Sequence, residues 1–334
     1  MNTVHSWARL LLLPLMLSAL SIAVCAQTNG YAQASSTTGE LDFDLRSRVA
    51  AAGSSGSKLY SSAVRTETTL APGVRVQFYG TRRFGAFTAQ SALIEKDWGG
   101  VAGRAQAGVV RLPFGIYEPR ETYASGLIDY PLARGDYAYH SVDWGVPGVA
   151  WTGGPANLQL EAAAFSGRGA QDWNNQGRIR GAAARAQTYA GDTIVGISRW
   201  DGAVQDSPAA AFMKPVHLTG LDLRFTKTQL LMRGEYLFGT LSGERMIGWY
   251  LDTYYRLPQY EHWSLVGRIE GLRPGTEHPE GHQLTLGARY VAARDWTLAV
   301  NWRTNNGPAY GKFWNPSAPK NGDVYFQAYH RISF

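Results

Sequence analysis

The sequence predicts an all-β protein, a 16-stranded antiparallel transmembrane β-barrel with an inward-folded long third loop. Apolar and polar residues alternate with a period of two through most of the chain, as in strands with one face in water. Tight turns rich in Gly, Pro and Asp separate these stretches. No later stretch approaches the roughly 18 unbroken apolar residues of a membrane-spanning helix, whereas a closed barrel can cross a membrane with its backbone groups paired.

The N-terminal segment 1–26 has the pattern of a secretory signal peptide. A weakly positive start precedes the apolar run Leu10–Val24, and Cys25-Ala26 ends in the small residue of a cleavage site. Cleavage after Ala34 also fits the spacing and stays an alternative. A lipoprotein anchored at Cys25 is a further alternative, against which the bulk of the preceding valine argues.

The mature chain is expected to hold a leader segment, residues 27–39, and the barrel, residues 40–334. Cys25 is the only cysteine, so a chain cleaved after Ala26 has neither a disulfide nor a cysteine metal site. The net charge of +6 comes mostly from arginines spread singly along the chain. This distribution favours a charged lining over a nucleic-acid surface, and we expect no nucleic-acid partner.

Each predicted strand has an apolar face and a charged face. In the first strand, Leu41, Phe43 and Leu45 are placed outward, while Asp42, Asp44, Arg46 and Arg48 are placed inward. The same alternation predicts the other strands at 58–70, 74–79, 87–93, around 104–106, 148–152, 158–164, around 185–187, 193–200, 221–225, 230–238, 247–255, 263–269, 284–290, 296–302 and 324–334.

Short and long connections alternate along the chain. The short set is Ala71–Gly73, Asp97–Gly100, Gly153–Pro155, Gly191–Asp192, Thr226–Thr228, Pro258–Glu261 and Ala293–Asp295. Transmembrane barrels have short periplasmic turns and longer external loops, which places both mature termini on the periplasmic side. The external connection at 81–85 is short against this pattern, and 14 or 18 strands stay open.

The last predicted strand ends in Phe334. Val324, Phe326 and Ile332 share its apolar face, which His330 interrupts. This pattern resembles the C-terminal strand recognised during outer-membrane assembly in Gram-negative bacteria, so we expect that machinery as a partner. Tryptophans at strand ends are expected to form interfacial girdles: Trp98, Trp151, Trp200, Trp249, Trp263 and Trp296.

The segment 111–147 breaks the alternation. It has neither a helical period nor a sustained strand pattern. Loops of this length are uncommon unless they are functional, so we expect it to fold into the barrel and narrow the lumen as a constriction loop. Its candidate residues are Arg111, Glu118, Arg120, Glu121, Asp129, Arg134 and Asp136.

Sixteen strands with a long loop after the fifth resemble the Gram-negative outer-membrane porin family, whose third loop forms a constriction inside the barrel. Arg111-Leu112-Pro113-Phe114-Gly115 is similar to the motifs at which such loops leave the wall, and to strings in phosphate-selective porins. The resemblance implies a homotrimer surrounded by outer-membrane lipid. It also implies passive diffusion of small hydrophilic solutes through a water-filled channel.

Arginines outnumber acids on the faces placed inward. The inward arginines are Arg46, Arg48, Arg65, Arg75, Arg104, Arg185, Arg199, Arg224, Arg233, Arg256, Arg268, Arg289, Arg303 and Arg331. Of these, the chief pore-lining candidates are Arg46, Arg75, Arg104, Arg233, Arg268, Arg289 and Arg331. The inward acids are Asp42, Asp44, Glu67, Glu161, Asp222, Glu235, Asp252 and Glu270. The surplus predicts preferential passage of anions, although any single arginine could instead brace the wall against an acid.

No motif indicates catalysis or a cofactor, and we expect neither an enzyme nor a bound metal. There is no G-x-S-x-G string, and Pro279 and Gly281 rule out a metalloprotease helix around His278 and His282. The alternatives to a passive channel are a lipase- or protease-like barrel enzyme, a channel specific for phosphate or carboxylate, and a structural or adhesive barrel with a plugged lumen.

Overall fold

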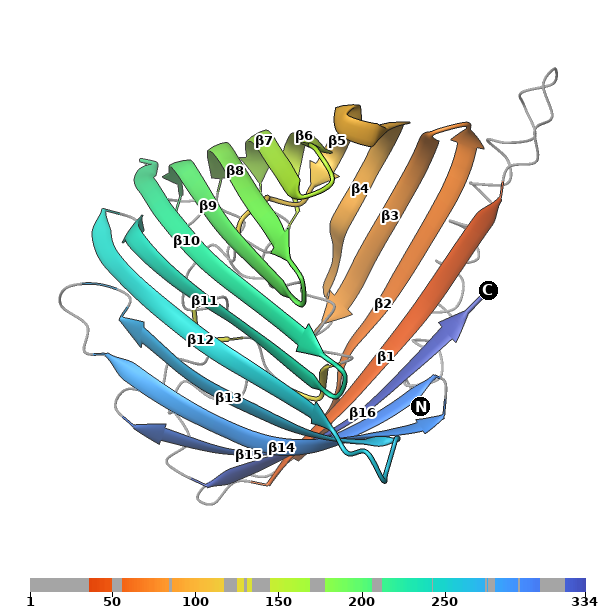
Figure 1. Cartoon of the computed structure of the whole chain (residues 1–334), viewed down its shortest axis with the longest axis vertical. Coiled ribbons are helices and arrows are strands. Elements are labelled where there is room, and N and C mark those ends of the chain that lie inside the picture. The colour runs from red at the N-terminus through yellow and green to blue at the C-terminus, as the bar shows by residue number, and fades with distance from the viewer. Residues whose placement is uncertain are drawn as a thin grey trace, which may run out of the picture.

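The computed structural model is a single closed antiparallel barrel of sixteen strands (Figure 1). It describes residues 36–49, 56–83, 86–116, 125–128, 131–133, 145–168, 178–205, 212–241, 243–273, 275, 280–293, 295–306 and 322–334. The predicted sixteen-stranded antiparallel barrel is confirmed. The first eight strands are β1 (Thr37–Val49), β2 (Gly56–Ala71), β3 (Val74–Arg83), β4 (Ala86–Gly99), β5 (Gly103–Val110), β6 (Val146–Gly153), β7 (Leu158–Arg168) and β8 (Arg178–Ala190). The second eight are β9 (Thr193–Val204), β10 (Lys214–Lys227), β11 (Leu230–Leu241), β12 (Glu244–Arg256), β13 (Trp263–Arg273), β14 (Gly281–Ala293), β15 (Trp296–Asn306) and β16 (Asp323–Ser333).

The barrel closes where β1 pairs with β16 (Figure 1). Two backbone hydrogen bonds of 2.8 and 2.9 Å join Gly39 and Phe334 at this seam. The ring of Phe334 lies where a side chain at residue 39 would stand, so any larger residue there would displace the ring. Thr37–Gly39, assigned to the leader segment from the sequence, are already part of β1.

The seven connections predicted to be short lie at one end of the barrel, within a few residues of their predicted places. The β3–β4 and β11–β12 connections span only two residues each and lie at the opposite end. The predicted short connections include a two-residue turn between β2 and β3, in which Gly73 has a φ of 68°, and a one-turn helix at Gly100–Ala102 between β4 and β5. Glycine adopts such a positive φ without the clash of a side chain. Within the described ranges, no helix is long and apolar enough to cross a membrane.

In most strands, the residues predicted to point into the lumen or toward the outside do so. In β1, Asp42, Asp44 and Arg46 are buried inside, while Phe43 and Leu45 are 37% and 49% exposed on the outer surface. Cross-strand pairs share a face, and the pairing places every predicted inward acid inside. It places all the predicted inward arginines inside except one.

The exception is Arg199 of β9, which the sequence placed inside. Its side chain is 49% exposed on the outer surface, whereas the next residue, Trp200, is 0% exposed and points into the barrel. The girdle position predicted for Trp200 is therefore wrong. Its ring packs inside on Phe114 and Phe165, each with a centroid separation of 6.4 Å, and burial of these apolar rings sets the register of the strand.

A second correction concerns β4. The predicted strand at 87–93 was treated as one continuous alternation, but the ladder between β3 and β4 shifts register at Tyr79/Gly80. The pairing skips Gln90, and such a bulge exchanges the faces of the residues that follow. Leu93 is consequently buried on the inner face, together with Glu95, which the sequence analysis omitted.

The apolar core lies inside the barrel. Leu112, Phe114 and Leu132 pack with inward residues of β7 to β13, among them Trp200 and Leu237. The described parts of the segment 111–147 therefore lie against the inner wall, and burial of apolar side chains holds them there.

Candidate functional site: an arginine-lined pocket in the lumen

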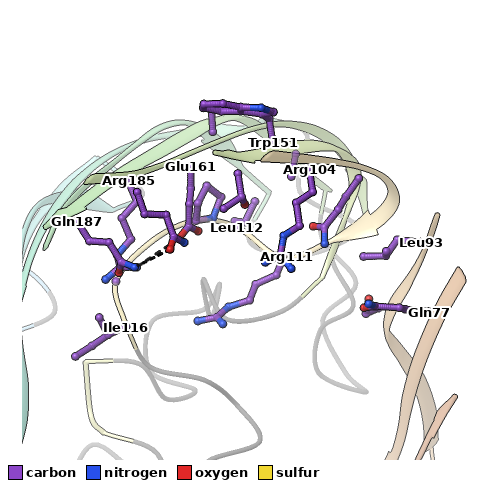
Figure 2. A pocket seen from close by; sticks show the side chains of 18 of the residues that line it. Gln77, Leu93, Arg104, Arg111, Leu112, Ile116, Trp151, Glu161, Arg185 and Gln187 are labelled. Carbon is purple, nitrogen blue, oxygen red and sulfur yellow. Dashed lines mark hydrogen bonds and ion pairs between the residues drawn. The ribbon is translucent and has the colours of Figure 1, made fainter. Parts of the chain in front are cut away.

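A pocket of about 680 Å³ lies on the inner side of β2 to β10. We call it the arginine pocket, because its lining includes Arg65, Arg104, Arg111, Arg185 and Arg224. Arg104 from β5 and Arg111 from the segment after it reach into the same space (Figure 2). Four glutamines add neutral hydrogen-bonding groups to the lining: Gln77, Gln106, Gln159 and Gln187.

The charges of the pocket are only partly neutralised. Within the described part of the chain, Arg224 has neither a hydrogen bond nor an ion pair, and its side chain is exposed. Arg65 lies 3.9 Å from Glu40 and from Glu67. These long contacts leave guanidinium groups available to a small anion, which Arg binds through its planar fork of donors.

Glu95 holds the β2–β5 side of the pocket together. Its carboxylate is 0% exposed and accepts hydrogen bonds from Arg75 and, at 2.7 Å, from Gln106. Arg104 lies 3.7 Å away. Two of the predicted wall arginines, Arg75 and Arg104, are thus brought together by an acid that sequence reasoning missed. The sequence signal for this acid is a charged residue two positions after Leu93, which plain alternation places on the outer face. The bulge in β4 moves it to the inner face.

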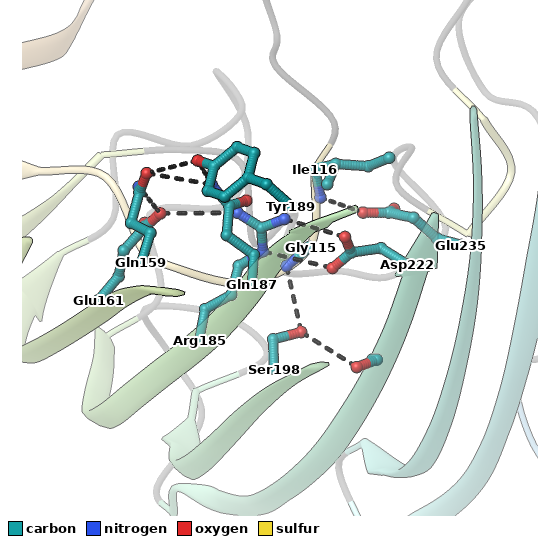
Figure 3. A network of polar contacts seen from close by, with 11 residues as sticks. Gly115, Ile116, Gln159, Glu161, Arg185, Gln187, Tyr189, Ser198, Asp222 and Glu235 are labelled. Atoms are coloured by element: carbon teal, nitrogen blue, oxygen red, sulfur yellow. Dashed lines mark hydrogen bonds and ion pairs between the residues drawn. The ribbon is translucent and has the colours of Figure 1, made fainter. Parts of the chain in front are cut away.

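A second network fixes the β7–β10 side. Arg185 donates to Asp222 at 2.9 Å and lies 3.5 Å from Glu161 (Figure 3). Gln187 donates to Gln159 at 3.1 Å, and Tyr189 donates to the same oxygen at 2.9 Å. Arg185 is paired with Asp222 and Glu161, so its charge is largely neutralised. Its main role is to hold the strands of this wall together.

The inner wall from β9 to β15 binds the backbone of the segment 111–147. Ser198 accepts a hydrogen bond from the Gly115 amide at 3.2 Å, and Glu235 accepts one from Ile116 (Figure 3). Glu270 accepts one from the Leu132 amide at 2.5 Å.

Asn301 makes two further contacts with this segment. Its Oδ1 accepts from Ile128 at 2.9 Å and its Nδ2 donates to the Gly126 carbonyl at 2.7 Å. Polar groups from β9 to β15 therefore satisfy buried backbone groups of the described loop residues.

Several predicted pore-lining arginines are braces. Arg233 and Arg268 both bind the buried carboxylate of Asp252, with Nε–Oδ distances of 3.0 and 2.5 Å. Arg46 lies 2.8 Å from Asp44 and is 1% exposed. These side chains are buried, so they stabilise the wall and do not meet a solute.

Comparison with known proteins bears on this architecture. No family model and no curated protein matches the sequence. Solved structures do match. OmpT of Vibrio cholerae, in its trimer form, has a TM-score of 0.63 at 12% identity, covering 90% of this chain and 100% of that one. OmpF of Salmonella typhi has a TM-score of 0.62 at 9% identity, covering 90% and 97%. A mutant of Rh. blastica porin has a TM-score of 0.55 at 12% identity, covering 90% and 100%.

The chain has a porin-like fold. At these identities the likeness concerns the arrangement of strands, not individual side chains. In this porin-like barrel two groups of inward arginines surround different acids. One surrounds Glu95 and the arginine pocket, and the other surrounds Asp252. Arg331 lies apart from both, 3.0 Å from Asp42 at the β1–β16 seam.

The remaining predicted site residues have mixed outcomes. Arg289 is inward, and its buried Nε has no hydrogen-bond partner among the described residues. Arg111 lies in the arginine pocket. The other constriction-loop candidates lie outside the described residues: Glu118, Arg120, Glu121, Asp129, Arg134 and Asp136.

The charge balance of the inner wall differs from the sequence estimate. Glu40, Glu95 and Asp323 join the inward acids, while Arg199 leaves the inward arginines. The surplus of inward arginines over inward acids is thus smaller than predicted. The distinguishing feature of the lumen is that several arginines line a single pocket. Among the described residues, no group of three or more His, Cys, Asp or Glu could hold a metal ion, and His278 lies outside them.

Proposed function

We propose that this protein is an outer-membrane porin, a passive water-filled channel for small hydrophilic solutes that favours anions. The observation that carries the proposal is the arginine pocket, in which Arg65, Arg104 and Arg224 face open lumen with long contacts or none. Concentrated Arg side chains are a common device of anion pores. The porin-like fold supports the channel and its location in the outer membrane of a Gram-negative bacterium.

The segment 111–147 is proposed as the constriction loop. Its described residues are anchored on the inner wall from β7 to β16, and the stretch 111–116 also lines the arginine pocket. A loop fixed there narrows the lumen and leaves solutes to pass along the exposed arginines. The acids predicted in the loop would then face the positive wall across the gap and set up a transverse field.

Ion selectivity of the purified protein in a planar bilayer tests this function. Under a KCl gradient in dilute salt, we expect a reversal potential on the anion side. Arg65→Gln with Arg224→Gln should lower the anion-to-cation permeability ratio about twofold or more, because charges in a narrow throat act strongly on an ion. Arg273→Gln is a control for the loss of one positive charge outside the lumen, since it lies at the last residue of β13, in the outward register.

Salt dependence completes the test. The difference between variant and wild type should shrink in concentrated salt, because the Debye length falls from about 10 Å at 0.1 M to about 3 Å at 1 M. Absence of conductance would contradict the channel. Conductance with cation preference, or with no response to the pocket substitutions, would contradict the anion preference alone.

A channel specific for phosphate or carboxylate is the second candidate. The clustering of several guanidinium groups with glutamines favours it, since Arg recognises both anions bidentately. In that case inorganic phosphate or malonate should block chloride current at concentrations that leave Arg65→Gln/Arg224→Gln channels open. Equal weak block of both proteins would favour simple diffusion.

The proposal also covers the assembly and export of the protein. The Vibrio cholerae structure is described in a trimer form, which supports a homotrimer for this chain. Phe334 at the barrel seam supports recognition of the last strand by the outer-membrane assembly machinery, and segment 1–26 is proposed as the signal that directs export. The proposal assigns no catalytic reaction and no cofactor to the barrel.

A further inference from the structure

The arginine pocket presents hydrogen-bond acceptors as well as positive charge. On the β2–β5 side, Gln77 donates to Glu67 at 3.1 Å and Gln106 donates to Glu95 at 2.7 Å. Each amide nitrogen is thus turned toward an acid of the wall. The two carbonyl oxygens accept no hydrogen bond from any residue that the structure describes. Because an amide oxygen can accept two hydrogen bonds, both oxygens are available to a solute in the pocket.

Gln187 repeats this arrangement on the β7–β10 side of the pocket (Figure 3). Its Nε2 donates to Gln159 at 3.1 Å and to the Tyr189 hydroxyl at 2.5 Å, so both amide hydrogens are used. Within the described ranges of the chain, nothing donates to its carbonyl oxygen. A third acceptor therefore lies in the same pocket, on a different strand from the first two.

The charged donors lie between these acceptors. In Figure 2 the side chains of Arg104 and Arg111 lie between Gln77 on one side and Gln187 on the other. Ile116 adds an apolar surface to the lining. The volume of about 680 Å³ falls in the range of roughly 300–1,000 Å³ of pockets that hold small organic ligands. A solute that satisfies the whole lining has an anionic group, several hydroxyl groups and a carbon skeleton.

We propose that the arginine pocket binds sugar acids, polyhydroxylated carboxylates such as glucuronate. Chloride and acetate have no hydrogen-bond donor, so they would leave the three carbonyl oxygens unpaired and would be repelled by them. A neutral sugar can donate to the carbonyl oxygens but offers no charge to the guanidinium groups. A sugar acid does both, with its carboxylate on the arginines and its hydroxyls on the glutamines. The inference rests on the proposed function and narrows its solutes from anions in general to this class.

Block of chloride current by three ring compounds tests the ligand class. Purified channels in a planar bilayer are titrated with glucuronate, with glucose, which has the hydroxyls but no charge, and with cyclohexanecarboxylate, which has the ring and the charge but no hydroxyls. Glucuronate should block at concentrations about tenfold or more below those of the other two, because it alone pairs with both kinds of group. Equal block by either of the other compounds, or no block by glucuronate, would overturn the inference.

Neutral substitutions then locate the site. Gln77→Leu with Gln187→Leu removes two carbonyl acceptors and no charge. Block by glucuronate should weaken about fivefold or more, while the reversal potential in KCl stays that of the wild type. Gln283→Leu is the matched control, because Gln283 is an inward glutamine on β14 outside the pocket, and it should leave the block unchanged. Undiminished block in the double variant, or equal weakening in the control, would contradict the inference.

The two measurements separate the ligand class from the channel. If the double variant forms no channel, Gln187→Leu alone gives the same comparison with a smaller effect. An anion-selective channel that glucuronate does not block would overturn this inference and leave the proposed function standing. A cation-selective channel, or no conductance at all, would contradict the proposed function and the inference with it.

Discussion

Arg199 and Trp200 are neighbours in β9 whose side chains lie on opposite sides of the wall. Residue type alone suggests the reverse, with arginine in the wet lumen and tryptophan toward lipid. The lumen, however, holds an apolar cluster in which Trp200 contacts Phe114 of the segment 111–147. Burial of a large ring therefore decides which face of β9 points inward.

Trp200→Ala tests this anchoring role. Removal of a buried tryptophan typically costs about 3–5 kcal/mol, and here the loss should loosen the 111–116 region from the wall. We expect a lower thermal transition and larger, noisier single-channel currents. Trp263→Ala, at a ring that is 43% exposed on the outer surface, is the control and should change the currents little. Equal effects of both substitutions would argue against a lumenal anchor at Trp200.

Glu95 shows what the sequence could not reveal at the residue scale. Alternation placed the first strand correctly, because its charged and apolar residues strictly interleave from Leu41 to Arg46. In β4 a bulge exchanges the two faces, and a bulge has no reliable mark in a single sequence. The acids predicted within β1, β7 and β12 were therefore found, while the carboxylate that joins Arg75 to Arg104 was not.

Glu95→Gln should increase anion preference. The change removes a buried negative charge between Arg75, Arg104 and Gln106 but keeps the shape of the side chain. Loss of the charged hydrogen bonds should cost about 1–3 kcal/mol of stability, and the reversal potential in dilute KCl should move toward anions. Glu280→Gln, an exposed acid outside the pocket, serves as the control. A shift toward cations would refute the role given to Glu95.

At the scale of elements, turns were the most predictable features. The seven short connections lie within a few residues of their predicted places, since Gly, Pro and Asp mark them by local chemistry. The long segment was recognised by its lack of period, but its contacts with Ser198, Glu270 and Asn301 join residues far apart in the chain. Only the closed barrel brings such partners together, so no local pattern could predict them.

The closing strand supplies a prediction at this scale. Phe334 pairs with Gly39 through two backbone hydrogen bonds, and its ring fills the space beside that glycine. Deletion of Phe334 should cut the amount of heat-modifiable barrel in the outer membrane far more than the amount exported. Phe334→Tyr, which keeps an aromatic ring, should assemble nearly normally. Normal accumulation of the deletion variant would show that the seam does not need this residue.

The whole molecule divides its lumen between the loop and the arginine pocket. Described loop residues pack on strands from β7 to β16, and the pocket lies between β2–β10 and the loop stretch 111–116. Sixteen strands and their alternating connections were predictable because each strand repeats the same two-faced pattern. The division of the lumen was not predictable, because it depends on which distant strands the loop reaches.

Orientation of the barrel in the membrane follows from the connections. The end of the barrel that carries the seven predicted short connections is expected in the periplasm, and Pro72 lies there in the turn between β2 and β3. A cysteine replacing Ser54, between β1 and β2, should react with a membrane-impermeant thiol reagent on intact cells, whereas one replacing Pro72 should not. Labelling of Pro72→Cys from outside would show that the barrel has the opposite orientation in the membrane.

The central claim is that the segment 111–147 lies on the inner wall and narrows the lumen, and one engineered disulfide tests it most directly. The Cβ of Ala133 lies 2.7 Å from the position of a Cβ at Gly248 on β12. A small shift brings this pair to the roughly 3.5–4.5 Å of a disulfide. Ala133→Cys with Gly248→Cys should therefore oxidise spontaneously, with the same conductance before and after reduction. Ala133→Cys with Ala63→Cys, across the lumen on β2, should stay reduced. Free thiols in the first pair, or a conductance that changes when its disulfide forms, would contradict the account.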